Sequence, residues 1–205
     1  MTSLDVSHFN TEKVKKMSYM ISGMRSLTSL NLNFNSKNVE MMYNMFSNLD
    51  SMKNLTVKLD THNVISMDYM FAFSKSLKSL NLSSFDTRNV KEMNHMFLQC
   101  ESLEDLDVSS FNTTNVQNFD SMFSDCHSIK VLDLSSFDTT NALSYSNMFY
   151  NCENLHRLDI SNFHFKLAKL KLNLNSQNPL VIIINKDIEK YIKRQAKDDW
   201  MVIVK

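Results

Sequence analysis

A unit of 25 or 26 residues recurs along this chain, and the recurrence restricts the possible folds more than any other feature. The leucine that opens segments such as "LDV", "LNL" and "LDL" returns at steps of 26, 25, 25, 26, 26 and 26 residues. Its positions are Leu4, Leu30, Leu55, Leu80, Leu106, Leu132 and Leu158. Because one unit of this size cannot bury its own apolar face, the repeat predicts six to seven units stacked into a solenoid over residues 1–163.

Each unit contains two different periods. Leu80 and Leu82 alternate with Asn81 and Ser83, which is the pattern of a strand with one buried face. The apolar residues of segment 90–100 recur at offsets 0, 3, 6, 7 and 10, which is the spacing of one face of a helix. The sequence therefore predicts an α/β repeat, a leucine-rich-repeat-type solenoid with a parallel sheet on one face and short helices on the other.

Stacking turns each repeated position into a ladder of like side chains. Three apolar ladders are expected: Met20, Met45, Met70, Met96, Met122 and Met148; Ile21, Phe46, Phe71, Phe97, Phe123 and Phe149; and Phe9, Phe34, Leu59, Phe85, Phe111, Phe137 and Phe163. These ladders contain 11 of the 14 Phe and 6 of the 15 Met. Thioethers can bind Cu(I), but each Met is followed by an apolar residue on the predicted helical face, so we interpret the ladders as core.

The three cysteines also share one repeat position. Cys100, Cys126 and Cys152 lack the C-x-x-C spacing of a zinc site, so we predict buried thiols rather than a disulfide or a metal site. The six histidines lie mostly at different repeat positions, and none belongs to a recognisable nucleophile motif. The sequence predicts no enzyme, no metal and no cofactor.

A polar ladder precedes each predicted helix. It contains Asn38, Asn63, Asn89, Asn115 and Asn141. Asparagine is a good helix N-cap, but a stacked asparagine can also donate hydrogen bonds to the backbone of a neighbouring coil. Both roles are structural, and the sequence does not choose between them.

The outward strand positions are the best candidates for ligand binding. They are Asn81, Ser83, Asp105, Asp107, Ser109, Asp133, Ser135 and Asp159. Stacked carboxylates such as Asp107, Asp133 and Asp159 repel one another, so the row favours cations or basic partners, or it simply forms a solvated face. We predict that these positions contact another protein.

Composition narrows the choice of partner. Acidic and basic residues balance at 22 each, so no net charge favours nucleic acid. One Gly and one Pro in the whole chain leave no glycine-rich phosphate loop. We find no apolar run of membrane-spanning length, and no signal peptide is visible.

The two ends of the repeat differ. Met1 stands where Leu27 stands in the next unit, so the chain begins within a repeat and the first coil is expected to be open, which would allow end-to-end association. Residues 164–205 are expected to form a strand–helix–strand cap. Strands are predicted at 169–175, 179–185 and 201–205, and Ile188, Tyr191 and Ile192 are expected on one helical face.

The segments "LDLSSFDTTN" (132–141) and "NVKEMNHMFLQCESL" (89–103), together with the 26-residue step, resemble the BspA-like leucine-rich-repeat family, including its mycoplasma lipoprotein-associated repeat. The resemblance covers about residues 4–163. It implies a bacterial surface or secreted protein that works in adhesion or binds a host extracellular component. An intracellular scaffold or regulator with the same fold is the alternative, and a hydrolase is less favoured.

Overall fold

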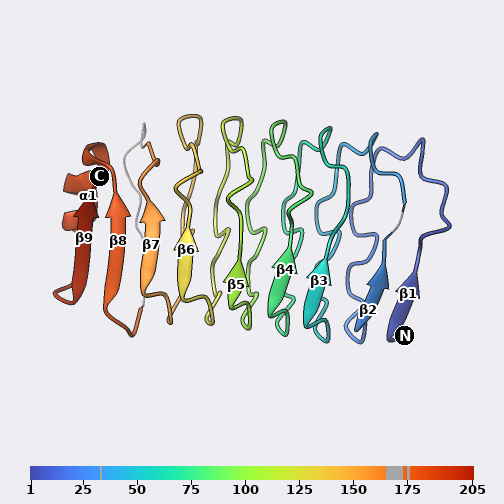
Figure 1. Ribbon diagram of the computed structural model, residues 1–205, viewed down its shortest axis with the longest axis horizontal. Helices are drawn as coiled ribbons and strands as arrows, with labels where there is room; N and C mark the ends of the chain where they lie inside the picture. The colour runs from blue at the N-terminus through green and yellow to red at the C-terminus, as the bar shows by residue number, and fades with distance from the viewer. Residues whose placement is uncertain (33, 165–172, 175) are drawn as a thin grey trace.

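The computed structural model describes residues 1–32, 34–164, 173–174 and 176–205. Its coils lie side by side in chain order, and the strands run parallel along one face (Figure 1). The strands of the repeat region are β1 (Ser3–Asp5), β2 (Ser29–Asn31), β3 (Asn54–Thr56), β4 (Ser79–Asn81), β5 (Asp105–Leu106), β6 (Val131–Asp133) and β7 (Arg157–Ile160). The chain is therefore a parallel β-solenoid of about seven turns.

The repeated leucines set the register between strands. Leu4 lies opposite Leu30, and Leu80 lies opposite both Leu55 and Leu106. These leucines point inward while their neighbours in the strand are exposed. Hydrogen bonding divides the strand face into three parallel sheets, β1–β2, β3–β5 and β6–β9, which follow one another along the solenoid.

The opposite face, which we call the turn face, corrects one prediction. The described part of segment 1–164 contains no helix, and this face is built from consecutive turns. Met96 N–H donates to the carbonyl of Met93 within the coil at 3.3 Å, an i→i−3 bond. The N–H groups of Met93 and Phe97 donate instead to the next coil. The predicted helices on this face are therefore wrong, because half of the N–H groups join coils and do not close helical turns.

Residues with positive φ explain why the helical spacing was misleading. His95 and Gln99 have φ of 59° and 55°, a left-handed conformation that interrupts a helix. Consecutive i→i−3 turns still return a side chain to the interior every three or four residues, which imitates the helical period. Other coils use Asn44 and Asn48 at the same positions, and asparagine tolerates this conformation well. The chain can therefore turn with a single glycine, Gly23 (φ 75°).

The interior is filled by the predicted ladders. Phe71, Phe97 and Phe123 are fully buried and stack with ring centroids 5.8 and 5.5 Å apart. Phe85 and Phe111 stack in a second column at 6.4 Å. Stacked aromatic pairs contribute about 0.5–1.5 kcal/mol beyond the area they bury.

Two polar ladders connect the coils. The buried hydroxyl of Thr87 donates to the carbonyl of Asn112 at 2.9 Å and accepts from the N–H of the same residue at 2.8 Å. Asn89 donates to the carbonyl of His62 in the preceding coil at 2.7 Å. Asn38, Asn63, Asn115 and Asn141 donate in the same way. Of the two roles considered for this ladder, the hydrogen bonds show the bond to a neighbouring coil, and no helix follows for these residues to cap.

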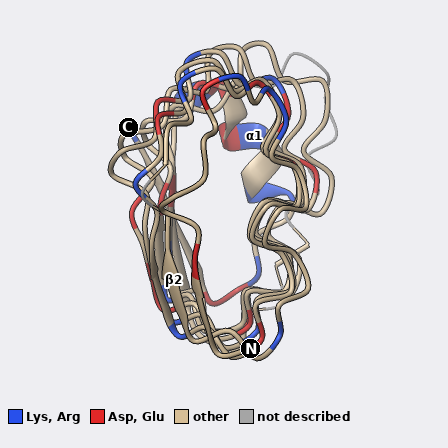
Figure 2. Cartoon of the chain, turned by 90° about the vertical axis from the view of Figure 1, so that its right-hand side faces the viewer, with Lys and Arg blue, Asp and Glu red and all other residues tan. Residues whose placement is uncertain are grey.

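The C-terminal segment extends the sheet and covers the core. It contains β8 (Leu180–Ile184), a short 3-10 helix η1 (Lys186–Ile188), α1 (Glu189–Lys193) and β9 (Trp200–Val204). Ile188 and Ile192 are buried, and α1 lies within the outline of the coils when they are viewed end-on (Figure 2). Tyr191, expected on the same face, is 40% exposed, so only two of the three predicted side chains are buried. Most of the strand predicted at 169–175 lies outside the described residues.

Candidate binding face

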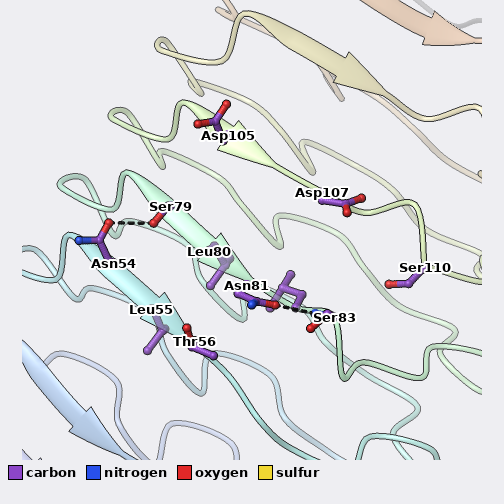
Figure 3. A pocket seen from close by; sticks show the side chains of 11 residues that line it. Asn54, Leu55, Thr56, Ser79, Leu80, Asn81, Ser83, Asp105, Asp107 and Ser110 are labelled. Carbon is purple, nitrogen blue, oxygen red and sulfur yellow. Dashed lines mark hydrogen bonds between the residues drawn. The ribbon is translucent and has the colours of Figure 1, made fainter.

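The outward residues of β3, β4 and β5 line a groove of about 460 Å³ (Figure 3). Asn81, Ser83, Asp105 and Asp107 are four of the eight predicted site residues, and all four line it. The strand face thus brings half of the predicted site into one concave surface.

A second groove continues from the first across the gap between β5 and β6. It has a volume of about 590 Å³ and shares Asp105 and Asp107 with the first groove. It adds Asp133 from the predicted set, and Lys130 and His156 also line it. The two grooves form one trough across β3–β6, which we call the strand-face trough.

The acidic row also has a structural role. The side-chain oxygen of Asp107 accepts the backbone N–H of Ser109 at 2.9 Å, and Asp133 accepts that of Ser135 at 2.9 Å. Asn81 forms the same bond with Ser83 at 3.0 Å. These bonds turn the chain after each strand. Hydrogen bonds from Ser109 lower the pKa of the Asp107 carboxyl, so it is ionised at neutral pH.

Ser109 and Ser135 are exposed, but they line neither groove. Each serine contributes its backbone N–H, which donates to the carboxylate of the aspartate two residues before it. Their predicted place on the binding surface is therefore peripheral.

Asp159 corrects a second expectation. It was predicted to face outward, but only 5% of it is exposed, and its carboxylate lies 2.7 Å from the ammonium of Lys205. Burial raises the pKa of Asp159, but hydrogen bonds from Lys205 and Ser161 outweigh burial and lower it overall. This carboxylate is neutralised within the fold and is not available to a ligand.

Three of the acidic residues that line the trough form no salt bridge with any described residue. No salt bridge within the described part of the chain includes Asp105, Asp107 or Asp133. Glu104, which also lines the second groove, pairs with Lys78 at 3.3 Å. The trough is therefore polar and uncharged over β3–β4 and acidic over β5–β6.

Four polar residues that line the first groove were not among the predicted site residues, and the fourth of them, Ser110, follows the predicted Ser109. Asn54, Thr56 and Ser79 line the uncharged part, and Ser79 donates to the side chain of Asn54 at 2.8 Å. Asn54 and Ser79 occupy the same register as Asp105. Extending the row of Asp105 to the third and fourth units would have found Asn54 and Ser79, and extending the row of Asn81 to the third unit would have found Thr56.

Metal-ligating and nucleophilic groups do not gather on this surface. Within residues 1–32, 34–164, 173–174 and 176–205, no three His, Cys, Asp or Glu side chains are placed to hold a metal ion. The cysteines are free and buried, and Cys126 donates to the carbonyl of Phe97 at 3.1 Å. Burial raises the pKa of the Cys100 and Cys152 thiols to about 12, which keeps them protonated.

A repeat protein with a polar trough on its parallel strand face is the class that this geometry defines. Residues 2–80 and 73–175 match the family described as "Mycoplasma protein of unknown function, DUF285". The two matches cover most of the sequence, so the chain belongs to this family. Comparison with curated proteins finds no matching relative. Among the described helices, none is long and apolar enough to cross a membrane.

Proposed function

We propose that this protein is a non-enzymatic interaction module that uses the strand-face trough to bind another protein. The observation that carries the proposal is the trough itself, which spans four strands and is lined by small polar side chains and free carboxylates. A solenoid supplies such a surface largely preformed, because each coil is stacked against its neighbours and each strand of the trough pairs with at least one other strand. Binding would then require little ordering of the module.

The partner that best suits this surface is an extended segment with basic side chains. Asp105, Asp107 and Asp133 supply negative charge over β5–β6, and charge complementarity increases both specificity and association rate. The resemblance to BspA-like repeats supports adhesion at the surface of a bacterial cell or after secretion, with a host extracellular component as the partner. An intracellular scaffold with the same face is the alternative.

Protein and glycan arrays provide the first test. The 205-residue chain should bind a set of array members that the variant Asp105→Lys no longer binds. The double variant Asp107→Asn/Asp133→Asn should weaken the same binding by about tenfold or more. Asparagine already forms the turn-closing bond at position 81, so this double variant removes charge while keeping the fold.

Glu12→Lys is the matched control, because it changes the net charge as Asp105→Lys does at an exposed position after β1. It should leave binding unchanged. Equal weakening by Glu12→Lys would show that net charge, and not the trough, governs binding. Unchanged binding by all the trough variants would assign it to another surface.

Location and catalysis are tested separately. Protease treatment of intact cells should remove the protein if it is displayed on the surface, and resistance would favour the intracellular scaffold. Incubation with broad hydrolase substrates should give no turnover. Robust turnover that is abolished by one His or Asp substitution would overturn the non-enzymatic proposal.

A further inference from the structure

The first coil exposes apolar side chains that the interior coils bury. Phe9 is 48% exposed, whereas Phe85 on the same ladder is 4% exposed. Val14 is half-buried, whereas its counterpart Val90 is fully buried. The end coil therefore presents the side of the core against which a further coil would stack.

Two further observations mark this end as an incomplete contact. A cavity of about 460 Å³ is lined only by residues between His8 and Met20, so it opens away from the second coil. Inside it, Ser18 Oγ is buried without a hydrogen-bond partner among the described residues. In later coils, the carbonyls at four alternate positions of the turn face accept N–H groups from the preceding coil. The corresponding carbonyls of the first coil, at alternate residues from Lys16 to Ser22, accept no hydrogen bond from any described N–H.

At the opposite end of the molecule, the outer edge of β9 is unprotected. β9 is a run of five apolar residues, and among the described strands it pairs only with β8. Met201, Ile203 and Val204 are 61%, 40% and 38% exposed. Natural sheets protect such edges with proline or with charged side chains. Here the nearest lysine, Lys205, has its ammonium paired with Asp159.

The two edges match each other in direction and register. All strands from β1 to β9 are parallel, so β9 of one copy can precede β1 of the next without reversal (Figure 1). Leu4 would continue the inward row that ends at Val202. Ile203 would lie beside Asp5, a pairing of Asp with Ile that already occurs between β7 and β8.

We infer that copies of this chain associate head to tail, with β9 of one copy adding to β1 of the next. The contact continues the coil-to-coil interface that joins β1 to β2 and β8 to β9 within the chain. A head-to-tail contact of translated copies does not close on itself, so it forms linear oligomers. This inference is independent of the strand-face trough.

Backbone hydrogen bonding identifies variants that block each edge. Val6 N–H donates to Asn31 in β2, and Lys205 N–H donates to Ile184 in β8. Because successive residues of a strand face opposite edges, the N–H groups of Ser3 and Val204 face the free edges. Ser3→Pro and Val204→Pro remove these donors while keeping the bonds inside the sheet, as proline on an edge strand allows. Ser3→Ala and Val204→Thr are the matched controls.

Sedimentation velocity over a wide range of protein concentration tests the inference. The average mass of the native chain and of both controls should rise with concentration, and each proline variant should associate roughly tenfold or more weakly. A mixture of Ser3→Pro with Val204→Pro should form one-to-one dimers and nothing longer, because each variant retains the edge that the other lacks.

Three results would overturn the inference. The native chain could stay monomeric at every concentration. Val204→Pro alone could dimerise, which would mean that first coils pair with each other, or Ser3→Pro alone could do so, which would mean that β9 pairs with itself. If circular dichroism shows that a proline variant is unfolded, Phe9→Lys and Ile203→Lys replace the pair, since both side chains are exposed.

Discussion

The strand face and the turn face of this solenoid both join coils through parallel rows of hydrogen bonds, but they use the backbone differently. On the strand face, extended residues alternate, and polar side chains project outward from β3, β4 and β5. On the turn face, residues with positive φ separate short turns, and large apolar side chains point inward. One face is thus free to vary its outward residues, while the other supplies most of the core.

The largest expected effect comes from removing core on the turn face. Phe97→Ala should lower the free energy of unfolding by about 3–5 kcal/mol, because Phe97 is fully buried between two stacked rings. Leu80→Ala on the strand face should cost less, about 2–3 kcal/mol, because Leu80 is 6% exposed and lies in a short strand. Urea denaturation measures both changes. An equal or larger loss for Leu80→Ala would contradict the assignment of the main core to the turn face.

A smaller effect is expected where the coil passes from the strand face to the turn face. Thr87→Val keeps the shape of the side chain but leaves the N–H and carbonyl of Asn112 without the Thr87 hydroxyl. It should lower the free energy of unfolding by about 2 kcal/mol. Thr87→Ser keeps the hydroxyl and should recover most of the loss in the same urea experiment. If Thr87→Ser loses as much stability as Thr87→Val, the hydroxyl does not account for the loss and the prediction fails.

Carboxylates on the two faces differ in pKa. Burial raises the pKa of Asp68 on the turn face to about 6, although Ser66 donates to one of its oxygens at 2.8 Å. Hydrogen bonds from Ser109 lower the pKa of Asp107 on the strand face. Asp68 therefore binds its proton more tightly in the folded state than in the unfolded state, and Asp107 binds it less tightly.

For Asp68 this difference predicts a loss of stability as the pH rises. The loss should begin near the unfolded pKa of 3.8 and be complete above about 6. Its size should be about 1–2 kcal/mol, because the group is only partly buried. Asp68→Asn should remove this contribution, and Asn94 occupies the same position in the next coil. Urea denaturation at pH 4 and pH 7 checks it, and an unchanged pH slope in the variant would refute it.

The smallest expected effect is that of a glycine substitution on stability, which should have opposite signs on the two faces. Gln99 has φ of 55°, so Gln99→Gly relieves a left-handed conformation and should be neutral or stabilising by up to about 1 kcal/mol. Ser29→Gly in β2 should destabilise by about 0.5–1 kcal/mol, because glycine weakens a strand. Thermal unfolding compares the two variants. Destabilisation by both would show that the turn face does not require positive φ at position 99.

The strands and ladders could be predicted from the sequence because recurrence within one chain reveals which residues stack. The helices could not be judged in the same way. Apolar spacing at segment 90–100 reports which side chains point inward, but it does not reveal that the N–H of Met93 bonds to the next coil. A helix and a row of turns share that spacing and differ in φ at His95 and Gln99.

The candidate site was predictable only where a residue's neighbours come from adjacent repeats. Asp105 and Asp107 were placed correctly on the outward side of the strand face because the repeat fixes their register. Asp159 was not, because its partner Lys205 lies 46 positions away, beyond the repeat. Whether the trough binds a partner, as proposed, depends on chemistry that periodicity does not report.

The turn face also gives the solenoid an electrical direction. In the coil-joining peptide units of segment 92–99, such as the one between Glu92 and Met93, the carbonyl accepts from the preceding coil and the N–H donates to the following coil. Peptide dipoles aligned in this way add together, as they do along an α-helix, whereas those of the strand face largely cancel. The carbonyl end of this dipole lies at the first coil, so each added coil lengthens a polarised row, and the two ends of the molecule are electrically unlike.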